Sequence, residues 1–356
     1  MNKSRHKKQI LFNLYSQNLE WVKEQPSISF KPDFSNGYLC PLCFDVFFQK
    51  DLDNTSLNPL TLEDIPPVSL GGKPLTLTCK KCNSISGHEL DVHLLNRLLE
   101  IDTQMFLPNS KSKATFELNG NKVNGMFEVE KNGRLKFDIQ SHRSNPIQAE
   151  KFSKEMFPPR TTYNPLFYPR QFIEPEYKTP PITMKYNKIS NERRAEIALL
   201  RIAYLIAFST LGNGFLINSG LIHVREQIQN PDKEILPKVF WIKYDFPTEL
   251  EGENIISLSK ELQCYLVVFN LRTASQTRQF AIALPGPTKP SIKIYNYITE
   301  ELCHGDGKTF FNATVEHIPK KDYLRSKEHA FIGNLYWQEY TKEDYKPRPK
   351  PKTNTE

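Results

Sequence analysis

The sequence predicts an α+β protein: a small metal-stabilised module near the N-terminus, followed by a second α+β domain with a central apolar helix and antiparallel strands. The first observation is a pair of Cys-x-x-Cys motifs, Cys40/Cys43 and Cys79/Cys82, which have the spacing of two halves of a metal knuckle. The second is residues 195–208, which are apolar nearly all round, as in a helix at the centre of a core. The third is the dominance of strand-like runs in the remaining C-terminal part.

The composition is that of a folded protein with room for two domains. The chain has 356 residues, of which 38% are hydrophobic and 12% aromatic, and this excludes a disordered protein. Its net charge of +7 favours an anionic partner such as nucleic acid, although mild basicity is also common in proteins that bind none. The cysteines form no disulfide framework, and neither a signal peptide nor a membrane span is evident. We therefore expect a soluble, cytoplasmic protein.

The first elements lead into and out of the knuckle. Residues 9–23 carry apolar side chains at helical spacing and predict an amphipathic helix. Residues 38–50 contain the first cysteine pair and predict a turn with a short aromatic strand. Residues 60–63 predict a strand that delivers Asp64, and Gly71-Gly72 indicates the turn into the next strand.

A helix is predicted from Ser84 onward. Its leucine stripe recurs at Leu90, Leu94 and Leu98. His88 and Asp91 are three positions apart, and side chains at this spacing are neighbours on a helix surface. Residues 1–110 are therefore expected to form one knuckle domain, in the order strand, turn, strand and helix.

The middle and end of the chain divide by composition. Residues 111–145 predict an antiparallel meander, because two Asn-Gly pairs separate alternating runs. Residues 146–183 are rich in proline and predict a linker. Residues 184–340 predict an α+β domain of unrecognised type, and the basic, Pro-rich residues 341–356 predict a disordered tail.

Within the second domain, Ser190 is the predicted cap of the central helix, and Gly212 and Gly214 indicate its end. A further helix is predicted at residues 221–229. Strands are predicted at residues 239–244, 264–271, 280–284, 292–298 and 311–318.

The two cysteine pairs predict a closed metal site. The thiolates of a Cys-x-x-Cys converge on one ion, and two pairs complete the tetrahedral four-sulfur coordination of structural Zn²⁺. Two disulfides or an iron–sulfur cluster are the competing interpretations. We expect structural Zn²⁺ bound by Cys40, Cys43, Cys79 and Cys82, with no coordination position left for chemistry.

The residues enclosed by and following the knuckle carry a resemblance. They run Leu62-Glu-Asp-Ile-Pro-Pro67, Ser69-Leu-Gly-Gly72, Leu77-Thr-Cys-Lys-Lys-Cys-Asn83 and Gly87-His-Glu-Leu-Asp91. In this order they resemble the HNH endonuclease family, in particular the subgroup in which a four-cysteine zinc knuckle holds the ββα-metal finger together. The resemblance covers about residues 38–100. It implies a metal-dependent endonuclease that hydrolyses phosphodiester bonds in DNA, and by analogy alone a restriction or phage-defence setting.

The resemblance also implies a second, catalytic cation, Mg²⁺ or Mn²⁺. Glu63 matches the acidic ligand of that ion, and Asn83 matches the closing ligand. Asp64 falls where the family has the histidine that activates water, and the middle asparagine of the family has no counterpart. A carboxylate next to a cation is a poor base at neutral pH, so this departure puts the usual mechanism in doubt.

Two compensations form a hypothesis for catalysis. Asp64 would join Glu63 as an oxygen ligand of the catalytic cation. His88, oriented by Asp91, would then act as the base, so the predicted catalytic residues are Asp64, Asn83 and His88. The alternatives are a surface hydrogen bond for His88 and Asp91, and simple turn chemistry for Glu63 and Asp64.

Lys73, Lys80, Lys81 and Arg97 are the predicted nucleic-acid contacts, with Lys80 and Lys81 alternatively only solvated. The expected partner is nucleic acid, DNA in particular, with no membrane, and with a homodimer or protein contact through the second domain. The alternative function is a catalytically degenerate zinc finger that binds nucleic acid or a protein. Affinity for a hard divalent cation beyond the zinc separates the two functions.

Overall fold

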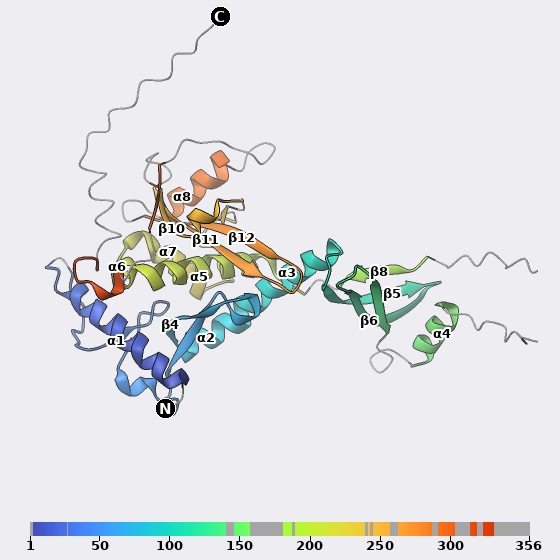
Figure 1. Ribbon diagram of the computed structural model, residues 1–356, viewed down its shortest axis with the longest axis horizontal. Helices are drawn as coiled ribbons and strands as arrows, with labels where there is room; N and C mark the ends of the chain where they lie inside the picture. Colours follow the sequence, from blue (N-terminus) through green and yellow to red (C-terminus); the bar gives the residue numbers. More distant parts are fainter. Residues whose placement is uncertain are drawn as a thin grey trace, which may run out of the picture. The chain divides into compact units, whose positions relative to one another are not determined.

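The computed structural model describes residues 3–26, 28–139, 146–156, 181–186, 189–238, 241–242, 245–256, 263–286, 291–302, 314–318 and 323–330. These residues form two compact units. Unit 1 comprises the described parts of Met1–Leu94, Glu192–Leu271 and Thr277–Glu356, and unit 2 those of Leu95–Asn191 and Arg272–Gln276. Both units contain helices and antiparallel sheets, which confirms the predicted α+β class (Figure 1).

This division differs from the predicted domains, in which residues 1–110 and residues 184–340 are separate. In the structure both regions contribute to unit 1. The reason is α5 (Glu192–Leu211), whose apolar surface is covered by N-terminal elements as well as by the C-terminal sheet. The ring of Phe208 on α5, for example, stacks on that of Tyr15 with centroids 4.8 Å apart.

Unit 1 begins with α1 (Lys3–Lys23), which contains the predicted helix 9–23 and starts earlier. Its buried apolar residues recur every three or four positions; they are Phe12, Tyr15, Leu19 and Val22. The short antiparallel strands β1 (Tyr38–Leu39) and β2 (Val46–Phe47) follow, and the helical turn η1 (Gln49–Leu52) comes directly after them.

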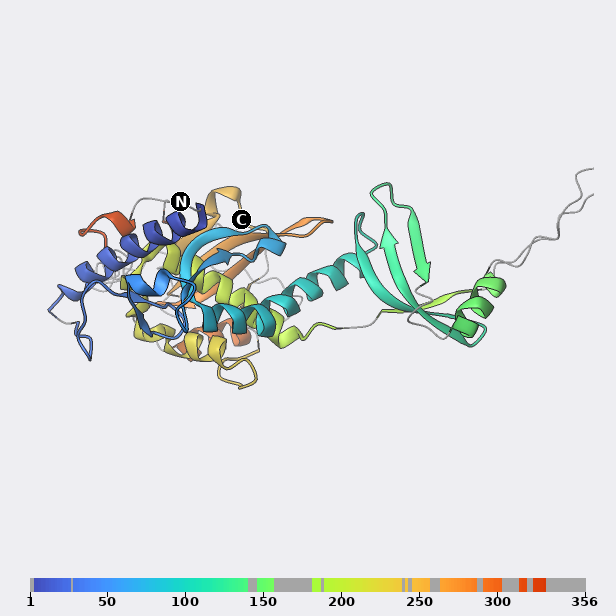
Figure 2. The same ribbon diagram turned by 90° about the horizontal axis from the view of Figure 1, so that it is seen from below.

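A β-hairpin forms the next element. Strand β3 (Leu60–Ile65) pairs antiparallel with β4 (Lys73–Cys79), and η2 (Val68–Leu70) lies in the connection. Glycine is required at position 72, because a Cβ there would lie 1.4 Å from the carbonyl oxygen of Pro66. The predicted strand, turn and strand are confirmed. In Figure 2 the hairpin runs alongside α5, which contacts both of its strands.

The predicted helix after the knuckle is also confirmed. It consists of α2 (Lys80–Ser86), the π-helical turn η3 (Gly87–Asp91) and α3 (Val92–Gln104), without a break between them. Leu90, Leu94 and Leu98 are all buried, as the leucine stripe predicts. The π-helical turn is not evident from the sequence. It adds a residue to one turn and so changes which side chains share a face.

The C-terminal part of unit 1 is a five-stranded sheet in the order β13-β10-β11-β12-β9. The strands are β9 (Trp241–Ile242), β10 (Gly252–Ile256), β11 (Cys264–Arg272), β12 (Thr277–Pro285) and β13 (Val315–His317). The helices around them are α5, α6 (Asn213–Leu216), α7 (Ile222–Gln229) and α8 (Ser291–Tyr297), with the turns η4 (Ser219–Leu221), η5 (Thr248–Leu250), η6 (Ile298–Leu302) and η7 (Tyr323–Arg325). Strands are therefore found within the predicted segments 239–244, 264–271, 280–284 and 311–318, of which the first and last are only partly described, and β10 was not predicted.

The prediction of a strand at residues 292–298 is wrong, because this segment is α8 followed by η6. Its buried residues are Ile294, Tyr295 and Ile298, which is the spacing of one helix face. The hydroxyl of Tyr295 donates to the carbonyl of Ala283 on β12 at 2.8 Å and so attaches the helix to the sheet.

Unit 2 contains the predicted meander. Strands β5 (Lys111–Leu118), β6 (Asn121–Val129) and β7 (Leu135–Ile139) pair antiparallel, and β8 (Thr183–Tyr186) pairs with β5 at the other edge. Helix α4 (Pro146–Met156) covers one face of the sheet (Figure 1).

The predicted linker over residues 146–183 is therefore wrong at its two ends, which form α4 and the start of β8. Ala149 and Phe152 on α4 are buried in the same cluster as Phe116 and Phe127. Ser190 lies two residues before the start of α5, and its backbone N–H donates to Glu100 at 2.9 Å. Residues 157–180 and the predicted tail 341–356 lie outside the described residues.

Candidate metal centre and the ion network beside it

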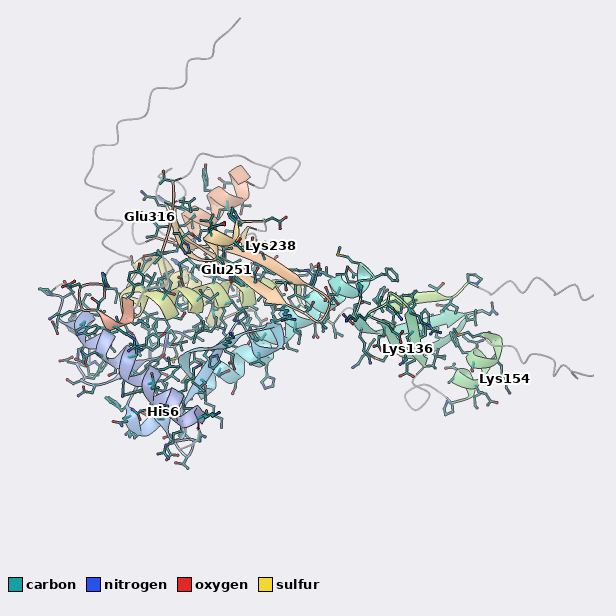
Figure 3. The ribbon with its side chains drawn as sticks, viewed as in Figure 1. His6, Lys136, Lys154, Lys238, Glu251 and Glu316 are labelled. Carbon is teal, nitrogen blue, oxygen red and sulfur yellow. The ribbon has the colours of Figure 1, made fainter. Side chains whose placement is uncertain are left out.

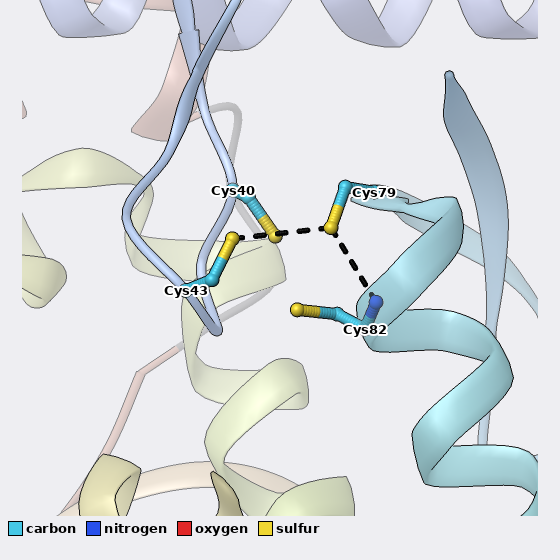
Figure 4. Close-up of side chains that lie close together, drawn as sticks. All are labelled: Cys40, Cys43, Cys79 and Cys82. Carbon is cyan, nitrogen blue, oxygen red and sulfur yellow. Dashed lines mark hydrogen bonds between the residues drawn. The ribbon is translucent and has the colours of Figure 1, made fainter. Parts of the chain in front are cut away.

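The four predicted cysteine ligands come together in unit 1. Cys40 and Cys43 lie in the turn between β1 and β2, Cys79 ends β4, and Cys82 lies in the first turn of α2 (Figure 4). Their sulfur atoms all lie within 4.8 Å of one another, and the Sγ atoms of Cys43 and Cys79 are 3.9 Å apart. Tetrahedral coordination with metal–sulfur bonds of about 2.3 Å places neighbouring sulfurs about 3.8 Å apart. The cluster therefore fits one metal ion held by four sulfurs.

The local backbone shapes this cluster. The N–H of Phe44 donates to the carbonyl of Cys40 at 2.9 Å, and Phe44 adopts a positive φ of 65°, so the chain turns tightly and brings the first pair together. The N–H of Cys82 donates to the sulfur of Cys79 at 3.4 Å. Hydrogen bonds among the four side chains lower the pKa values of Cys40 and Cys79 and raise those of Cys43 and Cys82, because the four thiols share their protons. The thiolate is the form that binds metals.

The turn that contains Cys40 and Cys43 contacts two helices of the C-terminal part of the chain. The hydroxyl of Tyr204 on α5 donates to the carbonyl of Pro41 at 2.8 Å, and the side chain of Gln229 on α7 donates to the carbonyl of Leu42. The guanidinium of Arg225 lies 4.3 Å from the centre of the Phe44 ring. These contacts fix the metal centre to α5 and α7, so the centre is a structural part of unit 1.

A second polar centre lies on the face of the hairpin that contacts α5. Glu63 is 3% exposed, and both of its carboxylate oxygens are occupied. The hydroxyl of Thr78 donates to Oε2 at 2.5 Å, and Arg201 of α5 forms an ion pair with Oε1. Arg201 itself is only 1% exposed. A guanidinium thus supplies the positive charge next to Glu63.

Asp91 completes this ion network. It lies at the end of the π-helical turn η3 and accepts hydrogen bonds from Arg201 at 3.1 and 3.3 Å. Burial raises the pKa of Asp91 to about 6, although the neighbouring Arg201 acts in the opposite direction. Burial by itself would lower the pKa of Arg201, but Glu63 and Asp91 raise it above its usual value. Arg201 therefore stays charged between its two carboxylates.

Asn83 and Asp64, the other predicted ligands, have different surroundings. The amide nitrogen of Asn83 donates to the hydroxyl of Thr61 at 2.9 Å and to the carbonyl of Leu62 at 3.2 Å. Asp64 is half-buried, and burial, with Glu63 second, raises its pKa, while Lys7 of α1 lowers it. The register of β3 with β4 shifts between Glu63 and Asp64, so simple strand alternation does not place the two side chains. Glu63 is bonded to Arg201 of α5, whereas the basic residue that acts on Asp64 is Lys7 of α1.

His88 and Asp91 do not form the predicted pair. The Asp91 carboxylate is bonded to Arg201, and the His88 side chain is exposed on the surface. Among the described residues, the four cysteines are the one group of three or more His, Cys, Asp or Glu side chains whose ligand atoms converge. A second cation site of that kind is not built in the described part of the chain.

The predicted nucleic-acid contacts fall into two groups. Lys73, Lys80 and Lys81 are exposed on the hairpin and on α2 of unit 1. Arg97 belongs to unit 2, is half-buried and lies 4.0 Å from Glu100. The three lysines thus remain available to phosphates.

Arg201 is the site residue that the sequence does not identify. It is separated from Glu63 by 138 positions, and no motif connects the two. The available signal is that Arg201 is the one charged residue in the apolar run 197–208 of α5, since a buried charge requires a partner.

No protein-family model, curated protein or solved structure matches this chain. Across the residues that the structure describes, none of the helices has the length and apolar content to cross a membrane.

Proposed function

We propose that this chain is a zinc-stabilised nucleic-acid-binding protein whose HNH-like ββα module binds without cleaving. The observation that carries the proposal is the buried Glu63 carboxylate, which is occupied by Arg201 and Thr78. The module keeps the scaffold of a metal-dependent nuclease, and an internal guanidinium takes the position of the catalytic cation.

The likeness to the HNH scaffold rests on order and connectivity. A two-stranded hairpin, β3–β4, leads directly into helix α2, and the cysteine cluster joins the hairpin end to the preceding turn. This is the strand, turn, strand, helix order that the resemblance of residues 38–100 implies. Zinc is the proposed ion because four thiolates in tetrahedral arrangement suit Zn²⁺, and no position remains open for substrate.

The absence of cleavage follows from the ligands. Phosphodiester hydrolysis in the described module would need a hard cation at the phosphate and a base for the attacking water. To bind such a cation, Glu63 would have to release Arg201, which would leave a guanidinium buried without this partner. Asp64 is half-buried, and both burial and the neighbouring Glu63 raise its pKa, which disfavours the charged form that would bind a cation.

Binding is supported by the exposed charge of the module. Lys73, Lys80 and Lys81 are exposed, and the whole chain carries a net charge of +7. Exposed lysines near a small rigid module contact phosphates without reading the sequence. We therefore expect affinity that falls steeply with salt.

The decisive experiment compares binding with cleavage. Purified protein is incubated with supercoiled plasmid and Mg²⁺ or Mn²⁺, and binding of the same DNA is measured over a range of salt concentrations. We expect salt-sensitive binding and no nicking. The double variant Lys80→Glu/Lys81→Glu should lose affinity, whereas the matched control Lys151→Glu/Lys154→Glu, on α4 of unit 2, should not.

Two results would overturn the proposal. Metal-dependent nicking by the wild type that disappears in Asn83→Ala would establish the nuclease instead. The absence of any salt-sensitive binding would remove nucleic acid as the partner and would favour a protein ligand. Metal analysis of the purified protein tests the zinc separately, with one equivalent of zinc and no iron as the expected result.

A further inference from the structure

A groove runs along α1 on the side that faces η1. It has a volume of about 600 Å³ and is open to the surface. Its walls are rich in amide and aromatic side chains, which include Phe12, Asn13, Gln17, Asn36, Phe48 and Gln49. All of them belong to unit 1, and none is a metal ligand or a member of the ion network around Arg201.

The groove is dominated by hydrogen-bonding side chains, and its charged lining residues are one acidic and one basic side chain, Glu20 and Lys50. Each amide side chain offers both a donor and an acceptor, which is also the property of a nucleobase edge. Glu20, which lines the groove, accepts a hydrogen bond from the N–H of Asn36 at 2.8 Å and lies 3.7 Å from Lys23, so its charge is compensated. Such a groove suits a neutral, planar ligand with mixed donors and acceptors better than a metal ion or a free phosphate.

Phe48 supplies a surface for stacking. It is 39% exposed, although it follows directly after the buried Phe47 of β2. Single-stranded nucleic acids are bound by stacking unpaired bases on aromatic side chains and by hydrogen bonds to the base edges. A partly exposed phenylalanine beside four amides offers both kinds of contact.

The same helix and the same turn continue into a basic surface. A second hollow of about 280 Å³ is lined by residues that include Arg5 and Lys8 of α1 and residues 52–54 at the end of η1. Lys3, Arg5 and His6 are exposed at this end of α1, where His6 is labelled in Figure 3. Asp53 offsets part of the charge, but the basic residues of the first turns outnumber it. With a rise of 1.5 Å per residue, Arg5 and Gln17 are about 18 Å apart along the helix.

We propose that this α1–η1 face binds single-stranded nucleic acid, with one base stacked on Phe48 in the groove and the adjoining phosphates at the basic end of α1. The inference rests on the proposed function and specifies its ligand. A base in a duplex has its Watson–Crick edge paired and both faces stacked, so the groove accepts a base only from an unpaired strand.

The test compares two ligands and two variants. Anisotropy of a fluorescently labelled single-stranded DNA oligonucleotide and of the corresponding duplex gives the affinity of wild type, Phe48→Ala and Ile10→Ala. Ile10 is a matched control, because it is 46% exposed on the same helix and does not line the groove. Loss of one stacked base weakens binding about 5- to 150-fold. We expect a loss of this size for Phe48→Ala with the single strand, and little change with the duplex or with Ile10→Ala.

A second measurement observes the base directly. An oligonucleotide that contains 2-aminopurine should lose fluorescence on binding to the wild type, and less on binding to Phe48→Ala at saturating protein. Unchanged zinc content and thermal stability of the variant would show that it is folded.

The outcomes separate the two proposals. If Phe48→Ala loses equal affinity for the single strand and the duplex, or loses no more than Ile10→Ala does, the proposed base-binding role of the groove is wrong. Nucleic-acid binding by the protein would still stand. Failure of the wild type to bind either ligand would overturn both. A loss of affinity for the single strand alone in Phe48→Ala would support both proposals.

Discussion

The cysteine cluster and the Arg201 network both bring the hairpin β3–β4 together with the helix that follows it, yet they obtain their positive charge in different ways. The cysteine cluster joins Cys79 and Cys82 to a turn a few tens of residues earlier and depends on an external ion. The Arg201 network joins Glu63 and Asp91 to a guanidinium that the chain itself carries on α5. An ion held by the four cysteines would be sensitive to chelators, whereas the guanidinium of Arg201 is part of the chain and cannot be removed.

Removal of the metal should have the largest effect. Structural zinc sites in small domains bind with apparent free energies of about 10–16 kcal/mol, which is comparable to the whole stability of a domain, about 5–15 kcal/mol. We expect a strong chelator, or Cys79→Ser, to unfold the knuckle region, as measured by loss of amide-exchange protection in β1, β2 and β4. The control is Cys264→Ser, which changes a buried free cysteine outside the cluster. A knuckle that stays protected without metal would show that the two centres do not differ as described.

Loss of one partner in the ion network should have the second largest effect on the free energy of unfolding. Glu63→Gln leaves the guanidinium of Arg201, which is 1% exposed, without its most buried carboxylate. Breaking a buried pair in this way costs about 3–5 kcal/mol. Urea unfolding of zinc-loaded protein measures the loss, and the double variant Glu63→Gln/Arg201→Met should recover part of it. A loss in Glu63→Gln below about 1 kcal/mol would show that water or another group compensates Arg201.

Asp91 should affect how stability depends on pH. Its pKa is raised in the folded protein to about 6, so the folded state binds the proton more tightly than the unfolded chain. The stabilisation from this group is complete below pH about 4 and is lost as the pH rises to about 6. The free energy of unfolding of the wild type should therefore fall relative to that of Asp91→Asn as the pH rises through this window. Above the window the two stability curves should run parallel. Curves that run parallel throughout would contradict the raised pKa.

His88 should have the smallest effect on stability. Its side chain is exposed, and surface substitutions of this kind change stability by less than about 0.5 kcal/mol. We expect His88→Ala to leave both the unfolding midpoint and DNA binding near those of the wild type. A His88→Ala variant that alone abolished metal-dependent nicking, with His93→Ala unaffected, would restore the catalytic hypothesis for this residue.

The sequence predicts the local parts of this structure and misses the long-range ones. The hairpin, the leucine-striped helix and the cysteine cluster depend on neighbours within about 45 positions, so their spacing is visible in the chain. Glu63 and Arg201 are 138 positions apart, and nothing local indicates that one partners the other.

The missed elements have similar causes. Residues 292–298 alternate well enough to suggest a strand, but the buried side chains are Ile294, Tyr295 and Ile298, which is the spacing of a helix face. Helix α4 lies at the start of a proline-rich stretch. Its two buried side chains lie in the core cluster of the unit 2 sheet, and the local sequence does not indicate this packing.

Unit 2 is inserted between two parts of unit 1, and this order has a consequence for synthesis on the ribosome. Translation proceeds at about 5–20 residues per second, so Glu63 leaves the peptidyl-transferase centre roughly 7–28 s before Arg201 does. The cysteines can bind their ion during that interval, whereas the carboxylates of Glu63 and Asp91 cannot be buried with a partner until α5 emerges. An ion bound by the cysteines would therefore hold the nascent hairpin at its cysteine end first, and its acidic end is completed only after residues 95–191 of unit 2 have been made.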